Sequence, residues 1–322
     1  MAIKKETELY APVKSFFAGR GYEVKAEVLG CDLVAVRPDA AAPVIVEMKK
    51  TFSLPLLLQG IDRQRTGAEV WLAVERNRTK KGAHNQRFAE LSALCRRLSL
   101  GFMTVTFYKT KAPVIEVWCE PGAAGASSGP PARPRIVAAE GQAPFGGQLA
   151  AEPPLAASYA VAAGGRKRSR AAKLLKEFAG RSGDYNVGGS TGRKLVTAYR
   201  ERALQCALAL HCRGELPPRE IGKLTGVPNA GLLLRDNHYG WFRRVSRGVY
   251  GLTDAGRAAL GEYEAVAAVW AARFEWAAGW LAADETAAGS ARRARGDGEP
   301  DAGSPDASGL NASGLNASGR RP

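Results

Sequence analysis

A long stretch of small residues divides the chain. Of the 45 residues from 121 to 165, 32 are Ala, Gly, Pro or Ser. Such a segment buries too little side-chain surface to offset the conformational entropy that ordering would remove. We therefore expect a flexible linker over 121–165, between a folded domain at 1–120 and a second domain at 166–285. Residues 286–322, which contain the string ASGLN twice, are expected to form a disordered tail.

The positive charge is concentrated in the second domain. The chain has 46 Lys and Arg against 31 Asp and Glu, a net charge of +15. Residues 164–260 alone hold 19 basic and 7 acidic groups, a net charge of +12. This excess indicates a polyanionic partner, either nucleic acid or an anionic membrane surface. No apolar run approaches the roughly 20 residues of a membrane span, and residues 1–8 lack the apolar core of a signal peptide. The sequence predicts a soluble, cytoplasmic protein that binds nucleic acid and no membrane.

Alternating helical and strand patterns in the first domain predict an α/β fold. Apolar residues recur at helical spacing over 6–20, and further helices are expected over 54–67 and 83–98. Six short apolar segments are expected to be strands: 22–29, 31–37, 44–50, 70–75, 102–108 and 114–119. The order α-β-β-β-α-β-α-β-β is typical of a mixed sheet covered by helices.

Charged residues interrupt the apolar strands at the centre of this sheet. Glu47 and Lys49 lie two residues apart on one strand, so both side chains point to one face. Asp32 begins the preceding strand, and the six-residue turn at 38–43 allows the two strands to form an antiparallel hairpin. Asp32 and Glu47 then converge near one end. Two neighbouring carboxylates raise each other's pKa unless a cation lies between them.

A divalent metal ion with a preference for oxygen ligands resolves this repulsion. Lys49, beside the pair, is able to hold a phosphate oxygen or orient a water molecule. A Lewis acid, an activated water and a charge stabiliser are the components of metal-assisted phosphodiester hydrolysis. An ordinary ion pair is the alternative explanation, because Asp followed by Glu-x-Lys on a strand occurs by chance in many proteins.

The arrangement resembles the PD-(D/E)XK nuclease superfamily, whose core has the order αβββαβ with this hairpin at its centre. Asp32 matches the Asp of the motif, and Glu47-Met48-Lys49 matches (D/E)-x-K; Cys31 stands where many members have Pro. The resemblance implies a restriction-endonuclease-like mixed sheet flanked by helices. It also implies that Asp32 and Glu47 bind Mg²⁺ or Mn²⁺, and that Lys49 positions the attacking water or steadies the developing charge.

Two helical residues match positions that often support this site in the superfamily. Glu8 lies on the first helix, and Gln59 lies on the helix after the third strand, with Arg63 one turn further on the same face. The resemblance implies that Glu8 and Gln59 assist catalysis. The alternatives are an exposed Glu favoured by the helix dipole and an ordinary helix-face amide.

A narrower resemblance covers about residues 1–260. The strings ETELYAPVK, GCDLVAV, LLLQGIDRQ and VWLAVER are similar to the DUF2161 family of PD-(D/E)XK phosphodiesterases. The string GGSTGRK at 188–194 resembles a signature stretch of the same family, which implies a loop that contacts a backbone phosphate. It lacks the Gly-Lys-Ser/Thr spacing of a nucleotide-binding phosphate loop.

The elements expected after residue 190 look like a winged helix-turn-helix domain. Helices over 194–212, 219–224 and 229–237 precede two short strands, 241–245 and 249–252, and a helix over 254–260. In such domains the second helix of the turn unit enters the major groove of duplex DNA and the wing touches the backbone. The candidate contacts are Arg235 on that helix and Arg243, Arg244 and Arg247 on the wing. The wing arginines are expected to pair with phosphates, which gives affinity without sequence choice.

These patterns favour a metal-dependent nuclease that hydrolyses DNA phosphodiester bonds while a winged helix holds the DNA. One alternative is a non-catalytic DNA-binding regulator whose nuclease-like domain only packs. Another is an adaptor that binds protein through its wing. Trp270, Phe274, Trp276 and Trp280 are expected to pack in the core or in a homodimer, and an aromatic surface for unpaired bases is the alternative.

Overall fold

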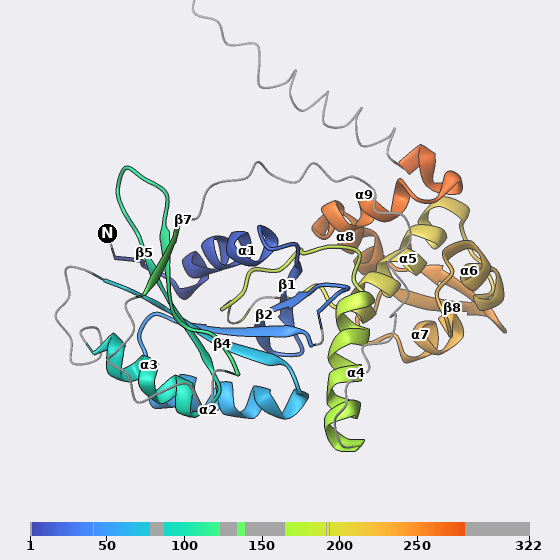
Figure 1. The fold of residues 1–322 in the computed structure, drawn as a ribbon. Coiled ribbons are helices and arrows are strands. Elements are labelled where there is room, and N and C mark those ends of the chain that lie inside the picture. Colours follow the sequence, from blue (N-terminus) through green and yellow to red (C-terminus); the bar gives the residue numbers. More distant parts are fainter. Residues whose placement is uncertain are drawn as a thin grey trace, which may run out of the picture.

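A seven-stranded mixed sheet forms the N-terminal part of the chain (Figure 1). The structure is a computed structural model that describes residues 2–40, 42–77, 87–122, 134–138, 165–190, 192 and 194–280. The strands lie in sequence order: β1 (Glu23–Val28), β2 (Cys31–Val36), β3 (Val44–Lys49), β4 (Glu69–Glu75), β5 (Gly101–Thr106), β6 (Val114–Cys119) and β7 (Arg135–Ala138). Neighbours are antiparallel except β3–β4 and β4–β5, which are parallel and are joined through helices.

Helices cover both faces of this sheet (Figure 1). On one face lies α1 (Tyr10–Ala18), which follows the short helix η1 (Glu6–Leu9) and packs through Val13, Phe16 and Phe17. On the other lie α2 (Leu54–Arg63), continued by η2 (Gln64–Thr66), and α3 (Phe88–Arg97). The predicted mixed sheet flanked by helices is confirmed.

The predicted hairpin at the centre of the sheet is also confirmed. β2 and β3 are antiparallel, with Leu33 opposite Val46 and Val34 opposite Ile45. Continuing this register by one residue brings Asp32 opposite Glu47. The two carboxylates therefore belong to neighbouring strands at the same end of the hairpin.

The C-terminal part is built around α5 (Ala198–Arg213), which contributes much of a separate apolar core. The elements that follow are α6 (Pro218–Thr225), α7 (Ala230–Asp236), the hairpin β8 (Phe242–Ser246) and β9 (Val249–Leu252), α8 (Asp254–Glu262), α9 (Glu264–Ala271) and η3 (Glu275–Ala277). Trp270, Phe274, Trp276 and Trp280 pack against this core, as expected of a buried aromatic stripe. None of the helices in the described part of the chain is long and apolar enough to cross a membrane.

Two elements differ from the boundaries expected at 120 and 166. β7 lies inside the Ala/Gly/Pro-rich stretch and pairs with β6 through Ile136 and Val137, whose β-branched side chains suit a strand. Helix α4 (Gly165–Ala179) begins at the expected second domain, yet its buried Leu174 and Phe178 pack with the sheet. Residues 123–133 and 139–164 of the expected linker, and the expected tail at 286–322, lie outside the described residues.

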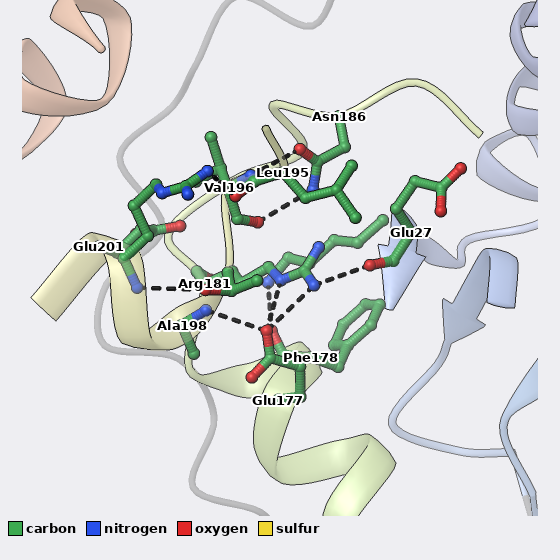
Figure 2. A network of polar contacts seen from close by, with 12 residues as sticks. Glu27, Glu177, Phe178, Arg181, Asn186, Leu195, Val196, Ala198 and Glu201 are labelled. Carbon is green, nitrogen blue, oxygen red and sulfur yellow. Dashed lines mark hydrogen bonds and ion pairs between the residues drawn. The ribbon is translucent and has the colours of Figure 1, made fainter. Parts of the chain in front are cut away.

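Side chains that follow α4 occupy the backbone groups of the edge strand β1 (Figure 2). The Arg181 guanidinium donates to Ala26 O at 2.9 Å and to Glu27 O at 2.8 Å. Asp184 Oδ1 accepts from Ala26 N at 2.8 Å. In return, Lys25 Nζ donates to the carbonyls of Phe178 and Arg181, at 2.9 and 2.8 Å. These bonds satisfy polar groups that a sheet edge would otherwise leave open, and they fix residues 178–184 to the sheet.

Candidate active site

Asp32 and Glu47 form a buried acidic pair between β2 and β3. Asp32 Oδ2 accepts a hydrogen bond from Met48 N at 2.8 Å, which orients its carboxylate across the hairpin. Burial raises the pKa of Asp32, and the Met48 N–H and the charge of Lys49 act in the opposite direction. The hairpin therefore holds a carboxylate in a setting that disfavours its charge.

Glu47 is more strongly perturbed. Its side chain is 2% exposed, and Oε1 lies 2.5 Å from Arg63 Nε of α2. Burial, followed by repulsion from Asp32, raises the pKa of Glu47 to about 7, although Arg63 favours the ionised form. Arg63 also donates to Gly30 O, so it is fixed between α2 and the turn before β2. One cation thus neutralises only part of the charge that the pair carries when ionised.

Lys49 lies at the more open end of the site. Its Nζ is 3.0 Å from Glu6 Oε2 of η1, and the Lys49 side chain is 34% exposed. Burial acts against the ammonium, but Glu6 and the charges of Asp32 and Glu47 prevail and raise its pKa. Lys49 is therefore a permanent cation that solvent, or a ligand, is able to reach.

The two predicted supporting residues lie differently from each other. Glu8 Oε1 accepts from Lys4 N at 2.7 Å and Lys5 N at 2.8 Å, so it caps the start of η1. The acidic residue of η1 that reaches Lys49 is Glu6. Gln59 is exposed on α2, and Arg63, one turn further along that helix, is the residue that contacts Glu47.

Glu27 is an acidic residue of this region that the sequence motifs did not indicate. It lies on β1 between Ala26, which pairs with Leu33, and Val28, which pairs with Cys31, and so stands opposite Asp32. Its backbone has a positive φ of 53°, unusual for a residue with a side chain. Burial raises the pKa of Glu27, opposed by N–H groups at residues 189–190 and reinforced by Asp32.

The donor chemistry of the pair suits a hard divalent cation. Met48 N and Arg63 Nε engage Asp32 Oδ2 and Glu47 Oε1, which leaves Asp32 Oδ1 and Glu47 Oε2 to face an ion. Within the described ranges no three His, Cys, Asp or Glu side chains gather into a metal-binding group. An ion held by two carboxylates would keep several water ligands, as Mg²⁺ commonly does.

The four predicted DNA contacts lie on the C-terminal part. Arg235 is exposed on α7 and pairs with Asp236 at 3.3 Å. Arg243, Arg244 and Arg247 are exposed on the hairpin β8–β9, and Arg243 pairs with Glu215 at 3.0 Å. These elements are separate from those that hold the acidic pair.

One comparison with known proteins bears on this site. Residues 148–259 match the family described as "Putative PD-(D/E)XK phosphodiesterase (DUF2161)". The match supports a nuclease or phosphodiesterase family. The matched range includes α4–α7, the hairpin β8–β9 and the loop before α5, whereas Asp32, Glu47 and Lys49 precede it. No curated protein and no solved structure matches the chain.

Proposed function

We propose that the chain is a divalent-metal-dependent nuclease that hydrolyses phosphodiester bonds of DNA. The observation that carries the proposal is the buried acidic pair. Asp32 and Glu47 stand side by side on neighbouring strands, and Glu47 keeps a raised pKa of about 7 despite its contact with Arg63. A second cation between the carboxylates removes the remaining repulsion, and Mg²⁺ or Mn²⁺ suits their oxygen donors.

The residues around the pair supply the rest of the chemistry. Asp32 and Glu47 would hold the ion, which acts as a Lewis acid and activates a water when it is bound. Lys49 Nζ, partly exposed and anchored by Glu6, is placed to donate to that water or to a phosphate oxygen. Its charge stabilises the negative charge that develops on the phosphate. Arg63 adds a second positive group beside Glu47.

The basic C-terminal part would hold the DNA as a winged helix. The hairpin β8–β9 follows α6 and α7 as a wing follows a helix-turn-helix, and its three arginines are exposed. The +12 charge of residues 164–260 supports binding to phosphates without sequence choice. Duplex DNA is the substrate and partner that this arrangement favours.

A cleavage assay tests the catalytic part of the proposal. The full chain is incubated with single- and double-stranded DNA and RNA, with Mg²⁺, with Mn²⁺ and with EDTA. DNA cleavage should require the metal and should be lost in Glu47→Ala, while DNA binding persists. Glu90→Ala, which removes an exposed carboxylate paired with Arg87 on α3, is the matched control. Cleavage that survives EDTA or Glu47→Ala would contradict the proposal.

The ion pairs of Glu47 with Arg63 and of Lys49 with Glu6 favour the second candidate, a non-catalytic DNA-binding regulator. In that case the charges serve only the fold, and Glu47→Ala strands Arg63 at a cost of about 3–5 kcal/mol. Thermal melts separate the two candidates. The nuclease proposal expects Mg²⁺ to raise the melting temperature of the wild type and to leave that of Glu47→Ala unchanged.

A further inference from the structure

A loop from far along the chain lies directly against the acidic pair. Residues 187–190 follow α4, and Gly188 packs against the β2–β3 hairpin. A Cβ at position 188 would stand 2.4 Å from Asp32 O, 2.7 Å from Met48 Cε and 2.9 Å from Tyr10 Cδ2. The first contact is with backbone, so only a glycine fits beside Asp32 without displacing it.

The loop is anchored on both sides of Gly188. Before it, Asp184 accepts from Tyr10 Oη, from Lys14 Nζ at 2.5 Å and from Ala26 N at 2.8 Å. After it, Ser190 N donates to Glu27 Oε1 at 3.0 Å. A loop held at both ends has little freedom to move away from an added methyl group, so Asp32 and Met48 must move instead.

Asp32 and Met48 are the two residues whose positions matter for a metal. Met48 N holds Asp32 Oδ2 at 2.8 Å, and Gly188 touches the backbone of one and the side chain of the other. We propose that Gly188 is a positioning residue for Asp32 and that residues 184–190 form a wall of the metal site. This inference rests on the proposed function, because it assigns a role toward the ion that Asp32 and Glu47 would hold.

The inference joins residues from both sides of the Ala/Gly/Pro-rich stretch into one catalytic unit. Gly188 lies within the matched range 148–259, and Asp32 and Glu47 lie before it. The matched segment would therefore shape the metal site itself as well as bind nucleic acid. Glu27, opposite Asp32 and bonded to the loop, is the point where the sheet and the loop meet beside the pair.

The test compares two glycine-to-alanine variants of the full chain by Mn²⁺ titration calorimetry. Gly188→Ala places a methyl group against Asp32, whereas Gly261→Ala, in α8, places one where nothing lies within 4 Å. Gly188→Ala should weaken Mn²⁺ binding about tenfold or more, the effect typical of a lost metal-site support. Gly261→Ala should bind Mn²⁺ as the wild type does. Equal affinity in a folded Gly188→Ala would overturn the inference and leave the proposed function standing.

A second pair of variants covers the case in which Gly188→Ala does not fold. Asp184→Ala frees the loop, and Asp184→Asn keeps an acceptor for Tyr10 and Ala26 N. Below the melting temperature of both, Asp184→Ala should bind Mn²⁺ several-fold more weakly and Asp184→Asn should recover the affinity. A fall in melting temperature with unchanged Mn²⁺ affinity means a merely structural role and overturns the inference. A wild type that binds no Mn²⁺ overturns the proposed function and this inference together.

Discussion

The attachment of residues 178–184 to β1 gives the sharpest stability prediction. The Arg181 side chain is 2% exposed and pairs with Glu177 at 3.0 Å. It also donates to the carbonyls of Ala26 and Glu27, as the bonds drawn around it in Figure 2 indicate. Arg181→Met keeps much of the side-chain volume but leaves these acceptors and a carboxylate without their cation.

The expected cost follows from those three contacts. Removing one partner of a buried charged network costs about 3–5 kcal/mol, and each buried carbonyl left unpaired costs about 1–3 kcal/mol. Because these losses overlap, we expect the free energy of unfolding to fall by about 3–5 kcal/mol. Urea denaturation measures it. Arg170→Met, an exposed position on the same helix, should change it by about 0.5 kcal/mol or less.

The result also decides how the chain is divided. If Arg181→Met unfolds at the same urea concentration as Arg170→Met, residues 178–184 do not support the sheet, and the two parts are independent domains as the Ala/Gly/Pro-rich stretch predicts. If it unfolds much earlier, the fragments 1–140 and 160–322, produced together, should associate and copurify. Arg181→Met should then weaken their association as well.

Three further predictions concern the site, the DNA contacts and pH. Lys49→Ala should slow DNA cleavage roughly 100-fold or more while Mn²⁺ binding is kept, because it removes charge stabilisation and no ligand; unchanged cleavage would exclude Lys49 from the chemistry. Arg243→Ala/Arg244→Ala/Arg247→Ala should weaken DNA binding and lower the salt dependence of the binding constant by about three ionic contacts; fluorescence anisotropy at several salt concentrations measures this, with Arg257→Ala on α8 as the control. Burial raises the pKa of Glu201, so the folded state disfavours its ionised form. The stability of the wild type relative to Glu201→Gln should therefore fall as pH rises from the ordinary Glu pKa to the raised one, and a relative stability that rises there would contradict the assignment.

Local patterns were sufficient to predict the hairpin that carries the acidic pair. The turn at 38–43 is short, and the strands on both sides are apolar, so their pairing follows from neighbouring sequence. The choice between Glu6 and Glu8 did not follow, because η1 is a tight helical turn that brings Glu8 back to Lys4 N and Lys5 N. Spacing rules for an α-helix do not describe that geometry.

Contacts between distant segments were not predictable from the sequence. The composition of 121–165 hides β7, whose Ile136 and Val137 are surrounded by Ala, Gly and Pro. Nothing in α4 itself shows whether its apolar stripe packs on the sheet or on α5. Gly188 was noticed only within a glycine-rich string, and its steric role depends on Asp32 being brought within reach by the fold.

The side chains that cover β1 also decide where the sheet is able to grow. A strand from another molecule would have to displace the Arg181 guanidinium and the Asp184 carboxylate before it could pair with β1. The opposite edge is β7, four residues long, where Ile136 is 68% exposed. Sheet extension between two copies of the chain would therefore use β7, and partial detachment of residues 178–184 would expose β1 as a new surface for aggregation.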